Sequence, residues 1–155
     1  MRPLSVEHLQ VWQRAHGLVL AVYRLTRAFP KDELFGLTSQ LRRAAASVPA
    51  NITEGYRKHH TADKLRFYNI AQASLDEATY HLLLAHDLEY GDTQALRSEA
   101  EEVAAMLAGY VGRIRENPGA RSQESEARIQ EPGARSQKPG GRLDSRQNGN
   151  QESAE

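Results

Sequence analysis

Glutamate and histidine are the first candidates for chemistry, because carboxylate and imidazole groups bind metals in helical proteins. A di-iron site in a four-helix bundle needs inward glutamates on four helices and two Glu-x-x-His motifs. Here Glu77 and His81 are four residues apart rather than three, and the sequence has no second copy of the pair. We therefore predict no metal site and no bound cofactor.

Nucleophiles and phosphate-binding loops give no stronger signal. Ser47 and Ser74 fall inside helical patterns, and neither lies in the strand-to-helix turn that exposes a nucleophilic serine. Gly36, Gly55 and Gly91 stand singly, so no glycine-rich phosphate loop is present. With no cysteine, thiolate chemistry is excluded. The sequence predicts a protein that is not an enzyme.

Five polar residues recur at spacings of 3, 4, 4 and 3 beside an apolar stripe: Gln40, Arg43, Ser47, Asn51 and Glu54. Polar groups at the edge of a core must find partners or cost about 1–3 kcal/mol each. Glu77 flanks the apolar face of a later segment in a similar way and could reach Arg43. We interpret these six residues as a structural polar network that fixes helix register or a subunit contact. The alternative is a ligand or nucleic-acid site centred on Arg43.

Charge is unevenly distributed although the formal net charge is zero. Residues 24–66 hold nine basic and four acidic residues, a balance of +5, whereas residues 76–102 hold one basic and eight acidic residues, a balance of −7. Surfaces of opposite sign suit either subunit pairing or phosphate attraction at the basic end. The residues that we expect to contact phosphate are Arg42, Arg43, Arg57, Lys58 and Lys64.

Four amphipathic helices must position these side chains. The first, ending at Phe29, places Trp12, Ala15, His16, Val19 and Tyr23 along one face and has a second apolar face beside it. The second runs from about residue 32 to residue 58 and continues through Pro49 with its stripe in phase. The third follows Thr61 as N-cap and stacks Phe67, Ile70, Ala71, Ser74, Ala78, Leu82 and Ala85. The fourth, after a Gly91 C-cap and an Asp92 N-cap, stacks Leu96, Ala100, Val103, Leu107, Tyr110, Val111 and Ile114. The sequence predicts an all-α, antiparallel up-and-down four-helix bundle over residues 1–117.

The remaining residues, 118–155, have a different composition. They contain no aromatic residue, and Ile129 and Leu143 are their only large aliphatic residues. Such a stretch buries too little surface to offset about 1–2 kcal/mol per residue of backbone ordering. We predict a disordered, low-complexity C-terminal tail. No apolar run in the chain approaches the roughly 18 residues of a membrane helix, and no apolar signal core precedes Trp12. A soluble, cytoplasmic protein is expected.

The run from Phe35 to Gly55, FGLTSQLRRAAASVPANITEG, resembles the signature of the bacterial four helix bundle protein family, also called the 23S rRNA intervening-sequence protein family. The resemblance extends over roughly residues 1–115. It implies an up-and-down left-handed bundle that assembles as a homopentamer, with no assigned catalytic residues. A distantly similar pentameric bundle serves diversity-generating retroelements and binds nucleic acid and a reverse transcriptase.

Residues and resemblance together favour a homo-oligomeric bundle, a pentamer, that associates with RNA or DNA through a basic face on the second helix. The alternative is a protein-interaction scaffold without nucleic-acid binding. The charge pattern alone does not separate the two hypotheses.

Overall fold

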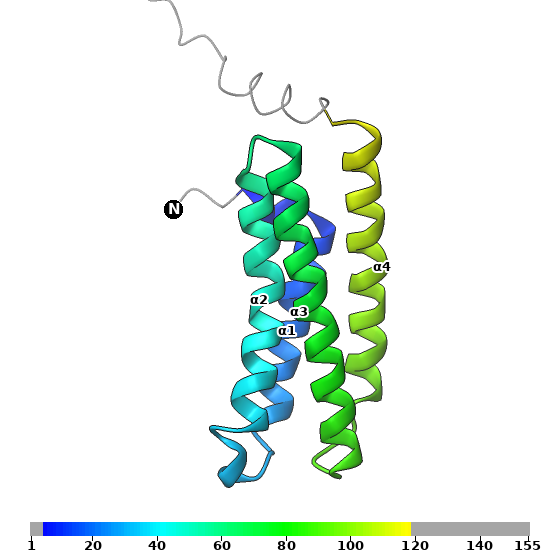
Figure 1. Cartoon of the computed structure of the whole chain (residues 1–155). Helices are drawn as coiled ribbons and strands as arrows, with labels where there is room; N and C mark the ends of the chain where they lie inside the picture. The colour runs from blue at the N-terminus through cyan, green and yellow to red at the C-terminus, as the bar shows by residue number, and fades with distance from the viewer. Residues whose placement is uncertain (1–4, 119–155) are drawn as a thin grey trace, which may run out of the picture.

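Four helices lie side by side in the computed structural model, which describes residues 5–118 (Figure 1). Their bounds are α1 Gln10–Thr26, α2 Leu37–Arg57, α3 Thr61–Asp87 and α4 Gln94–Glu116. Short 3-10 turns, η1 at Ser5–His8 and η2 at Lys31–Glu33, precede α1 and α2. Each helix packs against the next one in the chain and α4 returns to α1, so the predicted antiparallel bundle is confirmed. The predicted disorder of the tail concerns residues that, apart from Pro118, lie outside the described part of the chain.

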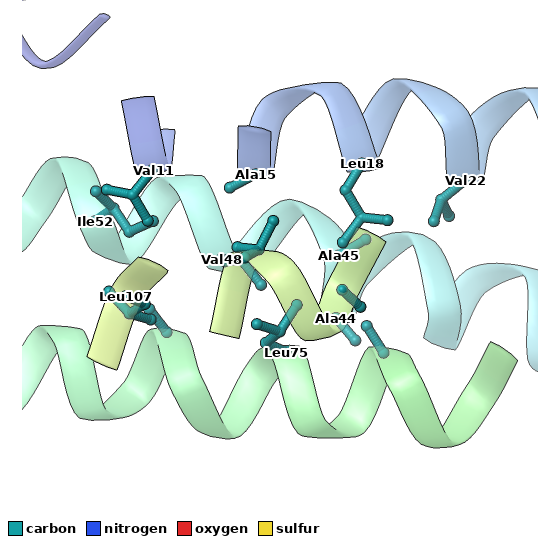
Figure 2. Packing of buried hydrophobic residues seen from close by; sticks show 14 of the residues in the cluster. Val11, Ala15, Leu18, Val22, Ala44, Ala45, Val48, Ile52, Leu75 and Leu107 are labelled. Atoms are coloured by element: carbon teal, nitrogen blue, oxygen red, sulfur yellow. The ribbon is translucent and has the colours of Figure 1, made fainter. Parts of the chain in front are cut away.

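The core lies along the bundle axis and draws on all four helices (Figure 2). Its labelled members in Figure 2 are Val11, Ala15, Leu18, Val22, Ala44, Ala45, Val48, Ile52, Leu75 and Leu107. The most extensive helix contact joins α2 to α3. Small residues on both helices, such as Ala44 and Ala78, let the two backbones approach closely. This contact fixes the orientation of α2, which carries most of the residues singled out from the sequence.

The predicted stripe of α4 is confirmed and most of that of α3 as well, whereas on α1 the second of the two predicted apolar faces supplies most of the buried residues. On α1, His16 and Tyr23 are exposed, whereas Leu18 and Val22 are buried. On α3, five of the seven predicted residues are buried: Ala71, Ser74, Ala78, Leu82 and Ala85. Ile70 is exposed, Phe67 is half-buried, and Tyr68, Leu75 and Lys64 join the buried face. Both helices have apolar residues over a wide arc, so periodicity alone does not say which part of the arc faces the core.

Pro49 lies inside α2, as predicted, and the helix continues through it from Leu37 to Arg57. Proline has no N–H to donate to the carbonyl of Ala45. One turn later the Thr53 hydroxyl donates to the Pro49 carbonyl at 2.8 Å. Pro49 itself is buried against the bundle, where its fixed ring packs without needing a hydrogen bond.

The second helix begins at Leu37, five residues later than predicted. Gly36 adopts a backbone conformation that is neither helical nor extended (φ −103°, ψ −119°) and separates the η2 turn from α2. One oxygen of the Glu33 carboxylate accepts the Leu37 N–H at 2.8 Å, which satisfies a free donor of the first helical turn. A Cβ on Gly36 would lie 2.5 Å from that oxygen, so the glycine makes room for the carboxylate.

The ends of α3 also differ from the sequence prediction. Thr61 is the first residue of α3 rather than its N-cap, which is His60. At the other end the left-handed residue is Glu89 (φ 59°), not Gly91. The N–H groups of Glu89 and Tyr90 donate to the carbonyls of His86 and Ala85, the pattern of a Schellman motif.

The following helix likewise starts one residue later than predicted. Its N-cap is Thr93 rather than Asp92. The Asp92 carboxylate nevertheless accepts the Gln94 N–H at 3.0 Å, so it still satisfies a donor of the first turn. The buried Thr93 hydroxyl donates instead to the Leu82 carbonyl at 2.8 Å and ties the connection to α3.

The two connections at this end of the bundle are linked by Tyr90. Its hydroxyl donates to the second oxygen of the Glu33 carboxylate at 3.0 Å, and its ring packs on Phe29 with centroids 5.5 Å apart. The hydrogen bond to Glu33, then burial, then the negative charges of Glu33 and Asp32 raise the pKa of the Tyr90 phenol above its ordinary value of 10.0.

Candidate nucleic-acid interface

The predicted polar stripe on α2 lies along its contact with α3. The Ser47 and Ser74 hydroxyls share a hydrogen bond of 2.9 Å between the two helices. The Asn51 amide donates to the Ser47 hydroxyl at 2.9 Å and to the Ser47 carbonyl at 2.8 Å. This half-buried cluster is a structural contact that fixes the register of α2 against α3.

The other members of the predicted network do not join this cluster. Glu54 pairs with Lys58 at 3.7 Å, and Glu77 with His81 at 3.4 Å, each within one helix. Gln40 and Arg43 are exposed and make no hydrogen bond or ion pair with any residue of 5–118. The structure therefore divides the stripe into a buried hydroxyl–amide part and a solvent-facing part.

Arg42 is the most firmly held of the predicted phosphate-contacting residues. Its Nε donates to the Thr26 hydroxyl at 2.8 Å, and its guanidinium carbon lies 4.7 Å from the centroid of the Tyr23 ring. The Thr26 hydroxyl in turn donates to the Val22 carbonyl at 2.9 Å. Arg42 thus bridges α2 to α1, with its guanidinium held over an aromatic face.

The remaining predicted cations occupy three different environments. Arg43 and Arg57 are exposed and fourteen residues apart, which places them on the same side of α2 about 21 Å from each other. Lys58 is half-buried and lies over the Phe67 ring at 5.0 Å, beside its partner Glu54. Lys64 is buried, 7% exposed, and its Nζ donates to the Tyr56 carbonyl at 3.3 Å. Lys64 therefore belongs to the packing between α2 and α3 and not to the exposed basic surface.

Sequence reasoning missed the contribution of α1 to this surface. Arg24 and Arg27 are exposed beside Tyr23, and neither forms an ion pair with residues 5–118. The signal was present in the composition: α1 has no acidic residue, and the only one in α2 is Glu54. Once both helices are known to lie together, their excess positive charge becomes one surface.

The acidic half of the chain lies on the other two helices. The helices α3 and α4 hold five basic and eight acidic residues, whereas α1 and α2 hold five basic residues and one acidic residue. Arg14 reaches from α1 to Glu99, at 2.9 Å, and to Glu102 on α4. Glu99 and Glu102 of α4 thus neutralise Arg14, whereas the other arginines of α1 and α2 have no carboxylate partner among residues 5–118.

Other kinds of site find no support in the described residues. Across residues 5–118, no three His, Asp or Glu side chains gather closely enough to hold a metal ion. Within the same residues, no helix has both the length and the apolar character needed to cross a bilayer. A shallow cavity of about 440 Å³ lies between the start of α1 and the end of α4, and its lining includes His8, Met106 and Arg113.

The family model of the 23S rRNA-intervening sequence proteins matches residues 7–109. The chain belongs to this family. A solved structure from Bacteroides thetaiotaomicron VPI-5482, described as a protein with unknown function from the S23 ribosomal protein family, shares the fold. It is 22% identical with a TM-score of 0.61, and the match covers 65% of this chain and 97% of that one. No curated protein matches the chain.

The run that carries the family resemblance serves mainly to pack α2. A Cβ on Gly55 would lie 2.6 Å from the Tyr68 ring, so only glycine lets the buried tyrosine lie across α2. Ile52 is buried, and Ser47 and Asn51 form the contact to α3. The exposed residues of the run are Phe35, Gln40, Arg43, Ala50 and Glu54, and Arg43 is the one cation among them.

Proposed function

We propose that this member of the 23S rRNA-intervening sequence protein family is a non-enzymatic, homo-oligomeric bundle that associates with RNA or DNA. The phosphate-contacting residues in this proposal are Arg42, Arg43, Arg57 and Lys58. Arg24 of α1 and Arg27, the residue that follows this helix, extend their field. Lys64, which we expected to contribute, is omitted because its side chain is buried. The proposal places the protein in the cytoplasm, where it would meet RNA and DNA.

The observation that carries the proposal is the set of arginines without carboxylate partners. Arg24, Arg27, Arg42, Arg43 and Arg57 form no ion pair with residues 5–118, although the chain has as many acidic as basic residues. Unpaired arginines gathered on and beside two helices whose one acidic residue is Glu54 supply the field that phosphate backbones need. Arg113 and Arg115 of α4 also form no ion pair within residues 5–118, but α3 and α4 hold eight acidic residues. The acidic helices on the other side limit binding to this face.

Assembly into a homo-oligomer, a pentamer, is the second part of the proposal. It rests on the family resemblance and on large apolar side chains exposed along α3 and just beyond its end, such as Ile70 (40%), Leu83 (38%) and Leu88 (45%). A contiguous patch of exposed apolar side chains is typical of surfaces that bind another protein chain, and the proposal requires these side chains to form one. Contacts through α3 would leave the α1–α2 side free for nucleic acid.

Two measurements on the purified full-length chain test both parts. Light-scattering mass before and after nuclease treatment reports subunit number and bound nucleic acid together. If four cations each neutralise a phosphate, affinity for a labelled oligonucleotide falls at least about 50-fold between roughly 50 and 200 mM salt. A monomer free of nucleic acid, or an affinity that salt does not change, would contradict the proposal.

The alternative function is a protein-interaction scaffold, which the exposed apolar residues of α3 also favour. Under this alternative, changing Arg42 and Arg43 together to Glu disrupts oligomer mass while nucleic-acid retention stays near zero throughout. Under our proposal the same change abolishes retention and leaves the mass intact. The matched control changes Arg113 and Arg115 of α4 together to Glu. Both arginines are exposed and form no ion pair with residues 5–118.

A further inference from the structure

A band of aromatic and apolar side chains follows the outer seam between α1 and α2. It consists of Trp12, His16, Val19, Leu20 and Tyr23 on α1, with Arg42 beside it on α2. Leu20 is 46% exposed and Tyr23 43% exposed, and His16 is exposed as well. We name this band, with Arg42, the α1–α2 seam.

Arg42 is held in the seam with part of its hydrogen-bonding capacity unused. Its Nε donates to the Thr26 hydroxyl, and its guanidinium carbon lies over the Tyr23 ring. The two terminal nitrogens have no hydrogen-bond partner among residues 5–118. A guanidinium whose position is fixed while its terminal donors remain free is suited to bidentate contact with a phosphate group.

The other end of the seam presents an aromatic stack. Trp12 Nε1 donates to the Thr53 hydroxyl at 3.0 Å, which fixes the indole against α2. His16 lies nearly parallel to that indole, with ring centroids 5.1 Å apart and an interplanar angle of 13°. Because His16 is exposed, the stack is open to a further planar group on its outer side.

The rise along α1 between the two residues that carry exposed rings is about three times the spacing of stacked nucleobases. His16 and Tyr23 are seven residues apart, about two helical turns or 10.5 Å along the same side of α1. Bases stacked along one strand are about 3.4 Å apart, so three steps cover this distance. Val19 and Leu20 fill the interval with apolar surface, which suits the faces of bases rather than their phosphates.

We propose that the α1–α2 seam binds an unpaired stretch of nucleic acid, with bases stacked on His16 and Tyr23 and a phosphate held by Arg42. The inference rests on the proposed nucleic-acid function and adds to it the class of ligand. A duplex keeps the faces of its bases inside its own stack, so only an unpaired strand offers them to side chains. Binding is expected to tolerate sequence, because stacking requires only a planar base.

The first test compares unpaired and paired ligands of the same length on the full-length chain. Fluorescence anisotropy is measured with labelled 12-nucleotide oligo-U RNA, oligo-dT DNA and a 12-base-pair duplex. We expect at least about tenfold tighter binding of one or both single strands than of the duplex, since only they gain stacking. The two single-stranded arms distinguish RNA from DNA.

Trp12 is the only tryptophan of the chain, so its intrinsic fluorescence reports on the seam in the unaltered protein. Stacking on His16, against the indole, should quench or shift the Trp12 emission in proportion to the bound fraction. This readout does not depend on the stability of any variant.

Two variants separate charge from geometry. Arg42→Lys keeps the charge but loses the planar fork, and we expect about tenfold weaker binding. Tyr23→Leu keeps an apolar side chain but loses the stacking face, and we expect at least fivefold weaker binding, the lower end of about 1–3 kcal/mol per stacked base. The matched controls are Arg115→Lys and Tyr80→Leu, an exposed arginine and an exposed tyrosine away from the seam, which should change binding less than about twofold.

The outcomes separate the inference from the function on which it rests. The inference is supported if the chain prefers single strands, if their binding quenches Trp12 emission, and if both seam variants bind more weakly. Equal binding of duplex and single strands, or binding with no change in Trp12 emission, overturns the seam as the site but leaves nucleic-acid association intact. Absence of binding to all three ligands at low salt overturns the proposed function and the inference together.

Discussion

Gly55 and Tyr68 show how one residue without a side chain makes a tightly packed helix contact possible. The Tyr68 ring lies across α2 at Gly55 and also packs edge-on against Tyr110 of α4, with centroids 5.3 Å apart. Because Tyr68 is 1% exposed, its ring has no open side toward which it could turn. The glycine is therefore required by packing and not by backbone conformation.

Replacing Gly55 with alanine should destabilise the bundle. Changing a glycine inside a helix to alanine normally raises the free energy of unfolding by about 0.5–1 kcal/mol. At Gly55 the new methyl group would lie 2.6 Å from the ring, and overpacking of this kind costs about 1–3 kcal/mol. We therefore expect the free energy of unfolding to fall. Urea denaturation monitored by circular dichroism measures it.

Gly109→Ala is the matched control for this change. Gly109 lies inside α4, and a Cβ built there meets nothing within 4 Å among the described residues. The free energy of unfolding should therefore rise by the ordinary amount of about 0.5–1 kcal/mol. Opposite signs at the two glycines support the packing argument, and a gain at both would refute it.

Single residues were predictable from the sequence where their role followed from their position on one helix. The half-buried setting of Ser47 and Asn51 followed from their place at the edge of an apolar stripe. The role of Arg42 did not, because its partners Tyr23 and Thr26 lie on another helix. Lys64 was misplaced for a related reason: its long side chain reaches back to the Tyr56 carbonyl, a contact that exists only once α2 and α3 are packed.

At the scale of elements, the end of α3 stores a local strain that can be removed. Glu89 adopts φ 59°, a left-handed conformation that costs a residue with a Cβ about 1–2 kcal/mol. Glycine adopts it without that cost and is the usual residue at this position of a Schellman motif. Glu89→Gly should therefore raise the free energy of unfolding by about 1 kcal/mol, seen as a higher Tm.

Glu89→Gln separates the backbone from the charge in this experiment. Glutamine keeps the Cβ and its strain but removes one negative charge from an acidic region, and it should stay within about 0.5 kcal/mol of the natural chain. If glutamine stabilised the bundle as much as glycine, repulsion between acidic residues and not backbone strain would be the cause.

Elements with one narrow stripe were predicted better than elements with a wide one. The buried residues of α4 and most of those of α3 were predicted correctly, whereas α1 presents apolar residues on two neighbouring faces and the sequence did not say which faces the core. The helix boundary at Gly91 was wrong because the turn uses Glu89 in a conformation that sequence rules reserve for glycine. The start of α2 was wrong because the cap comes from Glu33, across a turn that interrupts the helical pattern.

At the scale of the whole molecule, Tyr90 makes one end of the bundle sensitive to alkaline pH. The folded state favours the neutral phenol, since its pKa is raised above the ordinary value. The stability from this group is complete below pH about 10 and is lost as the pH rises through the folded pKa. We expect Tm to fall above that pH more steeply for the natural chain than for Tyr90→Phe.

The difference between the two chains isolates Tyr90 from the other groups that titrate at high pH. Tyr90→Phe should have the lower Tm at pH 8, and the gap should narrow as the pH rises. Tyr80→Phe, at an exposed tyrosine of α3, serves as control and should follow the natural chain at every pH. A gap between the natural chain and Tyr90→Phe that stays constant up to the most alkaline pH would contradict the assignment.

The division of charge between the two helix pairs has a consequence before any contact forms. The helices α1 and α2 carry a balance of +4, from five basic residues and one acidic residue, and α3 and α4 carry −3, from five and eight. A neutral molecule built in this way has an electric dipole across its width. A nearby polyanion exerts a torque on that dipole and turns the bundle so that α1 and α2 arrive first, and salt weakens this rotation. The acidic helices thereby help to determine which encounters are productive, although they touch no ligand.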